Sequence, residues 1–398
     1  MSFLTPISAC LLLLIALGLV ERFLVGRAWK AVPIRIHVNG TRGKSTVTRL
    51  IWSALREAGI PALAKTTGAA PRLLLPDGSE RPLRRRGKPN IREQLRTLVL
   101  ARRVGARAVV LECMALAPDL QWVAEQSMTR ATIGVITNAR TDHTEVMGGT
   151  VAEIAACLAN TIPQRSVLVV GDHQLAASYQ RCAEARGSRI VVADLSLHPS
   201  SFILHPSSFI LHPSSFKENQ AIALAVTREL GIADTIALAG MRRAPADPGE
   251  AVQGTVRCGA YLLPYRDVRK VNDPESFLLA MADFLGGIDP GGTRPGRPLI
   301  VYNHRSDRPQ RLLNFAAKAF PSLHASQILV TGERPALTAW RALQRLHVQP
   351  SAFSQVAPIR FVPEPRLPSA LAEFAGNCQA VVFCGNIHGF DLSGMLRS

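Results

Sequence analysis

Residues 39–46, Asn-Gly-Thr-Arg-Gly-Lys-Ser-Thr, contain the residue types that hold nucleotide phosphates. Glycines let backbone N–H groups turn toward phosphate oxygens, and the amino end of a following helix adds partial positive charge. We expect Lys44 to reach the β- and γ-phosphates and the Ser45 hydroxyl to ligate Mg²⁺. The residues predicted to bind the nucleotide are Gly40, Thr41, Arg42, Gly43, Lys44, Ser45 and Thr46. The loop therefore predicts a site for ATP and Mg²⁺.

A strand and a helix are predicted on either side of this loop, which is the context that a phosphate-binding loop requires. Residues 32–38 have the composition of a strand, and the helix after the loop has one apolar face and ends at Gly59. That face comprises Val47, Leu50, Ile51, Ala54, Leu55 and Ala58. The complete phosphate-loop pattern has a further glycine where this chain has Val38, so the alternative is a glycine turn that contains Gly-Lys-Ser by chance.

Three further polar residues follow predicted strands. Glu112 ends one strand, and Asp142 and His143 follow the next one along the chain. The carboxyl ends of strands in an α/β sheet line the crevice where ligands bind. We expect Glu112 to be another magnesium ligand, and Asp142 or His143 to hold a second metal ion or to orient the nucleophile. The catalytic candidates are therefore Lys44, Glu112 and His143, and a loop hydrogen-bonding pair is the alternative for Asp142 and His143.

Short apolar runs separated by helical stretches recur along the chain and predict an α/β fold. The runs are residues 108–111, 133–136, 167–170, 190–192, 298–302, 327–330 and 380–383. Continuous apolar strands of this kind are typical of a parallel sheet covered by helices on both faces. Because residues 244–249 and 286–298 are rich in Pro and Gly, we expect loops there. We predict a doubly wound ATP-binding domain over 30–243 and a smaller α/β domain over 250–398.

Three near-identical heptads, each containing His-Pro-Ser-Ser-Phe, occupy residues 197–216. A proline in every copy excludes a continuous helix, and solenoid repeats are longer. One interpretation is metal binding by the three histidines; the interpretation that we favour is an expanded low-complexity loop without chemistry. We expect a helix to resume at Phe216 and to end at Gly231.

The amino-terminal residues differ from the rest of the chain because residues 3–20 carry no charge. Eighteen helical residues span about 27 Å, which is enough for a bilayer core. The run lacks the basic start and small-residue cleavage site of a signal peptide, so we predict a transmembrane anchor over residues 1–26. A buried amino-terminal helix is the alternative. Basic residues follow the run at once, namely Arg22, Arg27, Lys30 and Arg35. They predict a single-pass protein of the cell membrane whose catalytic domains are cytoplasmic.

The chain carries 46 Lys and Arg against 29 Asp and Glu, a net charge of +17, which predicts an anionic partner. Seven cysteines without a CxxC pair indicate a reducing compartment rather than a disulfide framework. One basic cluster consists of Arg81, Arg84, Arg85, Arg86 and Lys88. It is expected to be a contact for a polyanion, a contact for anionic lipid, or a solvated loop.

These motifs resemble the central domain of the Mur ligases and folylpolyglutamate synthases, and still more the ATP-dependent ligase subunit of poly-γ-glutamate synthase. The resemblance rests on the phosphate loop, the strand end at Glu112, residues 137–143, and Glu218 and Asn219 opening a helix rich in Ala and Leu. Further similar segments are residues 89–94, 112–116, 272–276, 305–309 and 385–389. The resemblance covers nearly the whole chain.

This resemblance implies an ADP-forming acid–amino-acid ligase that makes capsular or secreted poly-γ-glutamate. In that family ATP phosphorylates a γ-carboxylate, and the amino group of the next glutamate attacks the acyl phosphate. The implied partners are glutamate, the growing polyglutamate chain, the membrane and the small membrane subunits of a synthase and export complex, with no nucleic acid. The basic cluster would then contact the polyglutamate chain.

The resemblance also implies residue roles. Ser45 and Glu112 would bind one Mg²⁺ and His143 a second. Asn219 would lie near the adenine. Arg305 and Asp307 would contribute from the carboxyl-terminal domain, with the substrates meeting between the domains. A histidine that the family has shortly before Glu218 is absent, because the heptad repeat ends there in Phe216.

Two alternatives stay open. One is another Mur-like ligase of the folylpolyglutamate or peptidoglycan type. Peptidoglycan ligases usually carry a UDP-binding domain ahead of the ATPase, and folylpolyglutamate synthases need no membrane anchor. The other is a P-loop motor or switch ATPase that moves a partner or binds nucleic acid through its basic surface. Dependence of ATP turnover on an amino acid separates the ligases from the motor.

Overall fold

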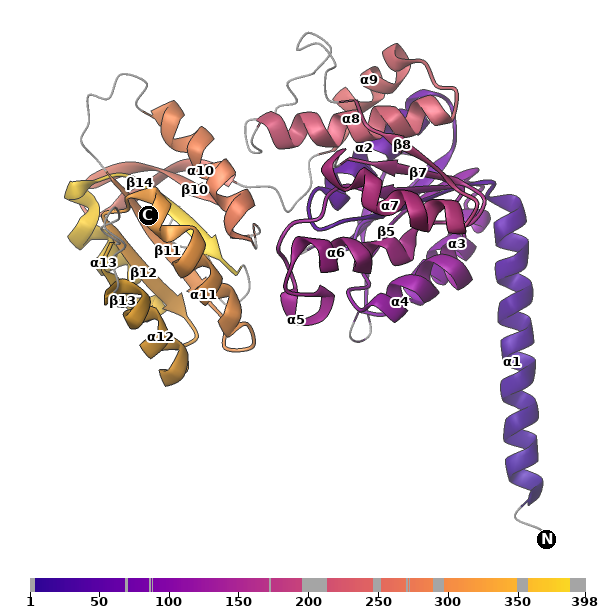
Figure 1. Cartoon of the computed structure of the whole chain (residues 1–398), viewed down its shortest axis with the longest axis horizontal. Coiled ribbons are helices and arrows are strands. Elements are labelled where there is room, and N and C mark those ends of the chain that lie inside the picture. The colour runs from indigo at the N-terminus through magenta and orange to yellow at the C-terminus, as the bar shows by residue number, and fades with distance from the viewer. Residues whose placement is uncertain are drawn as a thin grey trace. The chain divides into compact units, whose positions relative to one another are not determined.

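The computed structural model describes residues 4–68, 71–85, 87, 89–171, 173–194, 213–245, 252–269, 271, 273–288, 297–348 and 357–386 (Figure 1). These residues form two compact units, the first ending at residue 245 and the second beginning at residue 252. Residues 246–251, between them, overlap the Pro/Gly-rich segment 244–249 where we predict a domain boundary.

The first unit contains an eight-stranded sheet in the order β4-β3-β2-β5-β1-β6-β7-β8. Its strands are β1 (Ile34–Asn39), β2 (Ala62–Lys65), β3 (Arg72–Leu74), β4 (Glu80–Pro82), β5 (Ala108–Glu112), β6 (Ile133–Ile136), β7 (Val167–Val170) and β8 (Arg189–Val192). Strands β2, β5, β1, β6, β7 and β8 are parallel, whereas β3 pairs antiparallel with β2 and β4 with β3. The predicted α/β fold is confirmed, but the sheet is not wholly parallel, because a short antiparallel pair extends one edge.

Helices cover both faces of this sheet. They are α2 (Lys44–Glu57), α3 (Glu93–Arg103), α4 (Pro118–Val123), α5 (Thr144–Met147), α6 (Val151–Leu158), α7 (His173–Ala185), α8 (Pro213–Glu229) and α9 (Asp234–Arg242), with a π-helix at Ala124–Thr129 and a 3₁₀ turn at Ala159–Thr161. Ala108 and Val110 of β5 pack into a core with α2, α8 and α9. Val109 and Leu111 of the same strand point to the opposite face and pack with α3. This alternation is that of a doubly wound sheet.

A long apolar helix, α1 (Leu4–Ala31), precedes the first strand (Figure 1). Residues Ile7–Ala31 are a candidate membrane span by length and composition, with a mean hydropathy of 2.2 and 6% of the apolar window buried. The helix does not end at residue 26, where we predict the end of the anchor. Its last turns belong to the first unit, because Val25 and Ala28 are buried in the core beside α3.

The second unit contains a six-stranded sheet in the order β13-β12-β11-β14-β10-β9. Its strands are β9 (Val252–Cys258), β10 (Tyr261–Asp267), β11 (Arg297–His304), β12 (Gln327–Gly332), β13 (Ile359–Phe361) and β14 (Cys378–Gly385). All its pairings are parallel except that of β9 with β10. The helices are α10 (Pro274–Ile288), α11 (Pro309–Lys318), α12 (Leu337–Val348) and α13 (Leu367–Phe374), with 3₁₀ turns at Phe320–Leu323, Glu364–Arg366 and Ala375–Asn377. Ile300 and Tyr302 pack with α10 and α11, whereas Leu299 and Val301 pack with α13.

Two helix boundaries differ from the predicted ones, the start of α8 and the end of α10. Helix α8 begins at Pro213 and not at Phe216, since proline is readily accepted in the first turn. Glu218 and Asn219 therefore lie inside α8 rather than at its start. Helix α10 continues to Ile288, past the predicted start of a loop at residue 286. The heptad repeat before residue 213 lies outside the described residues.

Candidate active site

The predicted phosphate loop joins β1 to α2 and has two glycines with positive φ. Gly40 has φ of 128° and Gly43, at the amino end of α2, has φ of 78°. These values favour glycine, and neighbouring atoms also leave no room for a side chain. A Cβ on Gly40 would lie 2.0 Å from Thr137 Oγ1, and one on Gly43 would lie 2.2 Å from Asn219 Oδ1. The loop is thus pressed closely against residues 137–138 and against α8.

Thr137 and Asn138, at the end of β6, hold the loop by hydrogen bonds. The Thr137 hydroxyl donates to the Arg42 carbonyl at 2.6 Å, and Asn138 Oδ1 accepts from the Thr41 hydroxyl at 2.7 Å. The backbone N–H of Arg42 also donates to Asn138 Oδ1 at 3.0 Å. Lys44 Nζ lies over the loop and donates to the Gly40 carbonyl at 2.6 Å. These contacts fix the loop backbone and place the lysine ammonium above it.

Ser45 and Glu112 meet at the carboxyl end of the sheet. The Ser45 hydroxyl donates to Glu112 Oε2 at 2.8 Å, and the backbone N–H of Thr67 donates to the same oxygen at 2.8 Å. The two side chains come together because β5, which ends at Glu112, lies next to β1, which leads into the loop. Gly68 also faces this point, since a Cβ on Gly68 would lie 3.2 Å from Ser45 Oγ.

A hydroxyl and a carboxylate are oxygen ligands of the kind that Mg²⁺ prefers. Among the residues that the structure describes, no group of three or more His, Cys, Asp or Glu side chains could hold a metal ion by itself. Magnesium commonly keeps several waters and binds through one or two protein ligands together with nucleotide phosphates. Ser45 and Glu112 fit that kind of site.

Asp142 and His143 lie after β6, and Asp142 reaches the phosphate loop. Its carboxylate is 3.2 Å from the Arg42 guanidinium. His143 has φ of 49°, with its ring nitrogens 3.8 Å from the Asp142 carboxylate and 3.5 Å from that of Glu145. The structure therefore brings Asp142 to the loop and places His143 beside two carboxylates. The second metal site at His143 stays a prediction.

Asn219 of α8 lies against the phosphate loop and is buried. Its side-chain oxygen occupies the space that a side chain on Gly43 would need. The preceding residue, Glu218, is 3.4 Å from the Arg140 guanidinium, which joins α8 to the segment after β6. Asn219 thus adjoins the loop at the start of α2, and its predicted contact with adenine stays a prediction.

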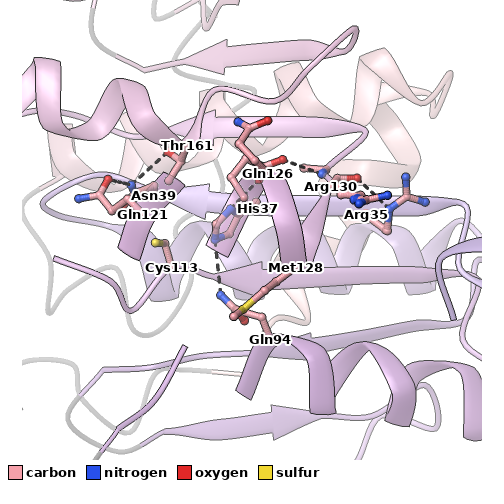
Figure 2. A network of polar contacts seen from close by, with 12 residues as sticks. Arg35, His37, Asn39, Gln94, Cys113, Gln121, Gln126, Met128, Arg130 and Thr161 are labelled. Carbon is pink, nitrogen blue, oxygen red and sulfur yellow. Dashed lines mark hydrogen bonds and ion pairs between the residues drawn. The ribbon is translucent and has the colours of Figure 1, made fainter. Parts of the chain in front are cut away.

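The face of β1 opposite the main core is polar, and it is buried at His37 and Asn39, a feature that the sequence pattern did not predict. Arg35, His37 and Asn39 alternate along this face, while Ile36 and Val38 point into the apolar core. Figure 2 shows the resulting network of hydrogen bonds. Asn39 Nδ2 donates to Gln121 Oε1 at 2.8 Å and to Thr161 Oγ1 at 3.1 Å. The residue immediately before the phosphate loop is therefore fixed from the helical layer.

His37 is the centre of this network and is 1% exposed. Its Nδ1 is 2.8 Å from Glu125 Oε2, and its Nε2 is 3.5 Å from the Gln94 amide nitrogen (Figure 2). Burial opposes the charged form, but interactions with Cys113 and Glu125 outweigh it and raise the pKa of His37 to about 9. The raised pKa favours the imidazolium form of His37 at neutral pH, with its Nδ1 2.8 Å from the Glu125 side chain inside the fold.

Lys65 is another buried cation close to Glu112. It ends β2 opposite Leu111 of β5, is 0% exposed, and has its Nζ 3.6 Å from Glu93 Oε2. Burial lowers the pKa of Lys65 to about 8, against the attraction of Glu93 and Glu112. The sequence offered no signal for Lys65, because its proximity to Glu112 arises from the order of the strands.

Arg305 and Asp307 lie in the second unit, after β11. They pair with each other at 2.6 Å, and the Ser306 between them has its backbone N–H bonded to Glu333 Oε2 at 2.7 Å. This loop is therefore internally braced at the carboxyl end of β11. The predicted contribution of Arg305 and Asp307 to a nucleotide in the first unit stays a prediction.

Comparison with known proteins identifies two family domains in the chain. The Mur ligase middle domain matches residues 38–211, and the poly-gamma-glutamate synthase CapB C-terminal domain matches residues 268–395. The PGA synthase CapB of Bacillus subtilis (strain 168) is 34% identical over 334 residues, which are 82% of this chain and 81% of that protein. The capsule biosynthesis protein CapB of Bacillus anthracis is also 34% identical over 334 residues, 83% of this chain and 70% of that protein.

Solved structures of Mur-type ligases share the fold. E. coli FolC in complex with ADP has a TM-score of 0.62 at 17% identity, covering 93% of this chain and 91% of FolC. The bifunctional folylpolyglutamate synthase/dihydrofolate synthase of Yersinia pestis, complexed with AMPPNP and Mn, has a TM-score of 0.61 at 18% identity, covering 93% and 90%. MurF from Acinetobacter baumannii has a TM-score of 0.60 at 14% identity, covering 92% and 76%. These similarities concern the fold.

Proposed function

Since the chain belongs to the CapB family of poly-γ-glutamate synthases, within the Mur ligase superfamily, we propose that it extends poly-γ-glutamate with ATP and releases ADP. It is an enzyme of the amide-ligase type. The observation that carries the proposal for its site is the meeting of Ser45 and Glu112, 2.8 Å apart, beside a glycine loop under Lys44.

The phosphate loop supports ATP as the energy source. Backbone N–H groups around Gly40 and Gly43 and the amino end of α2 suit phosphate oxygens, and Lys44 adds a positive charge beside the loop. When bound between Ser45 and Glu112, Mg²⁺ would neutralise charge on the transferred phosphoryl group. Asp142 lies 3.2 Å from the guanidinium of Arg42 in the middle of the loop and would hold this positive charge beside the proposed phosphate site.

In the proposed reaction the γ-carboxylate of the growing chain takes the γ-phosphoryl group of ATP, which leaves ADP and an acyl phosphate. The neutral amine of the next glutamate then attacks the acyl carbon, phosphate leaves, and a proton is lost from the new amide nitrogen. Lys44 would stabilise negative charge on the phosphoryl oxygens during transfer. Exclusion of water would protect the acyl phosphate from hydrolysis.

The proposal extends to where the enzyme works. We place it at the cell membrane, anchored by the apolar part of α1, with both units in the cytoplasm. Small membrane subunits of a synthase and export complex are proposed as partners, because a polyanion made in the cytoplasm needs a route across the bilayer.

The test is the dependence of ADP release on glutamate in membranes that contain the neighbouring gene products. ADP release should rise with glutamate, and a γ-linked polymer should grow in proportion, whereas aspartate and folate should do little. Lys44→Ala should abolish both signals, because it removes charge from the transition state and no core packing. Lys318→Ala, which alters an exposed lysine of the second unit, is the matched control and should behave as the wild type.

The motor ATPase is the rival that this assay separates. ATP hydrolysis that is indifferent to glutamate, with no polymer formed, would contradict the ligase and favour the motor. Polymer formation by a folded Lys44→Ala protein would instead agree with ligase activity and contradict the assignment of residues 39–46 as the phosphate-binding loop.

A further inference from the structure

Residues 83–85 and 87, which follow the β3–β4 hairpin, and the amino end of α3 line a cavity of about 560 Å³ in the first unit. Its lining contains four arginines, Arg84, Arg85, Arg92 and Arg96, and one carboxylate, Glu93. Three leucines, Leu73, Leu83 and Leu100, supply aliphatic surface, and Gly87, Asn90 and Thr97 make up the rest of the lining. Guanidinium groups bind carboxylates through paired hydrogen bonds, and an aliphatic wall suits methylene groups. The lining therefore matches an acidic ligand with aliphatic segments.

Two of the four arginines already have carboxylate partners. Arg85 forms two bonds with Glu93, at 2.8 and 3.1 Å, and Arg92 pairs with Glu21 of α1 at 2.6 Å. Arg84 and Arg96 are exposed, and neither has an ion-pair partner among the residues that the structure describes. The cavity thus retains two cations for a ligand.

The floor of the cavity is joined to the candidate active site by one ion pair. Glu93 lines the cavity and lies 3.6 Å from Lys65, which ends the strand next to β5 and its terminal Glu112. Lys65 is fully buried and does not line the cavity. A ligand in the cavity would therefore lie beside the active site without touching Ser45 or Glu112.

We propose that this cavity holds carboxylates of the growing polyglutamate chain, behind the end that is being extended. The proposal rests on the proposed function, since it presumes an acidic polymer as product. Arg84 and Arg96 would bind successive carboxylates, while the Arg85–Glu93–Lys65 pairs keep the floor rigid and separate from the reacting groups. Such a subsite would retain the chain between additions.

Anionic lipid is the other class of ligand that suits arginines beside a candidate membrane helix. The charges favour the polymer, because Arg92, the lining arginine that contacts α1, is already neutralised by Glu21. The two arginines without carboxylate partners belong to the segment after β4 and to α3 itself. The ion pair of Glu93 with Lys65 also places the cavity beside the strand that ends at Glu112, and binding of lipid would not require that position.

The first test is binding of a fluorescently labelled γ-linked glutamate oligomer to the full chain, in detergent and without ATP. Arg84→Gln combined with Arg96→Gln should weaken binding about tenfold, the scale of two carboxylate pairs at a partly exposed site. The control is Arg102→Gln combined with Arg103→Gln, which removes the same charge from the far end of α3 and should leave affinity unchanged. Arg84→Lys with Arg96→Lys should recover only part of the affinity, because lysine cannot form the paired contact.

The second test is steady-state synthesis with acceptor oligomers of increasing length. The Arg84→Gln, Arg96→Gln protein should show a KM about tenfold higher for long acceptors, with kcat and the KM for glutamate unchanged. Equal affinity of wild type and variant for the oligomer would overturn the inference while leaving the ligase intact. Loss of binding to phosphatidylglycerol vesicles with unchanged oligomer affinity would also overturn it and identify a lipid contact. Oligomer binding that depends on Arg84 and Arg96 in a protein without glutamate-dependent ADP release would contradict the proposed function and keep the polyanion site.

Discussion

Glu112 uses one carboxylate oxygen for two hydrogen bonds, from Ser45 and from the backbone of Thr67. Among the residues that the structure describes, none donates a hydrogen bond to its other oxygen, and a metal ion would draw on the negative charge of both oxygens. A substitution at Glu112 can therefore remove the negative charge of the site and keep its hydrogen bonds. A glutamine at this position keeps an oxygen for both donors and loses the charge.

Glu112→Gln should therefore weaken Mg²⁺-dependent ATP binding by at least about tenfold, which is the scale seen when even an outer partner of a metal ligand is lost. Calorimetric titration of Mg·ATP into wild type and variant measures the change. Glu184→Gln on the exposed side of α7 is the matched control. Equal affinities in the two proteins would make Glu112 an ordinary strand end.

His37 gives the interior of the first unit a pH dependence. Its pKa in the folded chain, about 9, exceeds the ordinary value of 6.5, so the folded state binds the extra proton between these values. Its contribution to the free energy of unfolding is complete below pH 6.5 and is lost as pH rises through 9. The size expected from this shift is on the order of 3 kcal/mol.

Hydrogen exchange of the β1 amides at pH 6.5 and pH 9, corrected for intrinsic rates, should show this loss in the wild type. His37→Gln should be less stable at pH 6.5 and much flatter between the two values. Lys65 acts in the opposite sense above pH 8, but both proteins contain it, so the comparison isolates His37. Parallel pH profiles for the two proteins would contradict the charged pair with Glu125.

At the scale of elements, apolar runs predicted the central strands closely. The predicted segments at 133–136 and 167–170 coincide with β6 and β7, because buried parallel strands are continuous apolar runs. Strands β3 and β4, the outermost two at one end of the sheet, were missed, since each has three residues and together they contain Arg, Glu and Pro. Such strands exist through pairing with a neighbour, which is not visible in their composition.

Composition also limited what could be predicted of the site. The glycine loop, Ser45 and Glu112 could be predicted from the sequence, because a short motif and a strand end are recognisable in it. Lys65, Gly68 and the buried face of β1 were not, because the order β2-β5-β1 brings them together from separate parts of the chain. The alternation of Arg35, His37 and Asn39 in a strand was the available signal for the polar network.

The heptad repeat is the element without a role in the proposed chemistry. Helix α8 begins at Pro213, so deletion of residues 197–210 leaves the whole helix and Asn219 in place. Activity should be unchanged or improved, since shortening the loop lowers the free-energy cost of closing it by only about 1 kcal/mol. Glutamate-dependent ADP release of the shortened chain measures this.

Replacement of His198, His205 and His212 by alanine in the full-length chain is the matched control for metal binding. Neither change should alter metal content, measured by elemental analysis. Loss of bound metal or of activity in either protein would overturn the low-complexity interpretation.

In the molecule as a whole, the first part of α1 is the proposed membrane anchor and its last turns pack against the first unit. Its apolar first part is exposed, and its last turns carry Val25 and Ala28, which are buried beside α3. Removal of residues 1–20 should release the chain from membranes and leave its stability unchanged. Removal of residues 1–31 should cost about 2 kcal/mol or more, because it also exposes the surface that these two side chains cover.

Membrane flotation and thermal denaturation of the two truncated chains test the division. If the chain without residues 1–20 remains bound to membranes in high salt, another segment is the anchor. Association that disappears only in high salt would indicate a contact through basic side chains.

Only Val32 and Pro33 separate α1 from β1, and the helix is fastened on two sides, by the Trp29 indole bonded to the Met128 carbonyl and by Glu21 paired with Arg92. If α1 crosses a bilayer, it is then joined to the first unit rigidly and not through a flexible linker. An enzyme on a flexible linker would tumble and present every side to the lipid surface in turn. An enzyme held by a rigid helix keeps its first unit in one orientation to the bilayer. Proteins that diffuse in the membrane would then always meet the same side of that unit, and assembly with them would be a two-dimensional search at a fixed orientation.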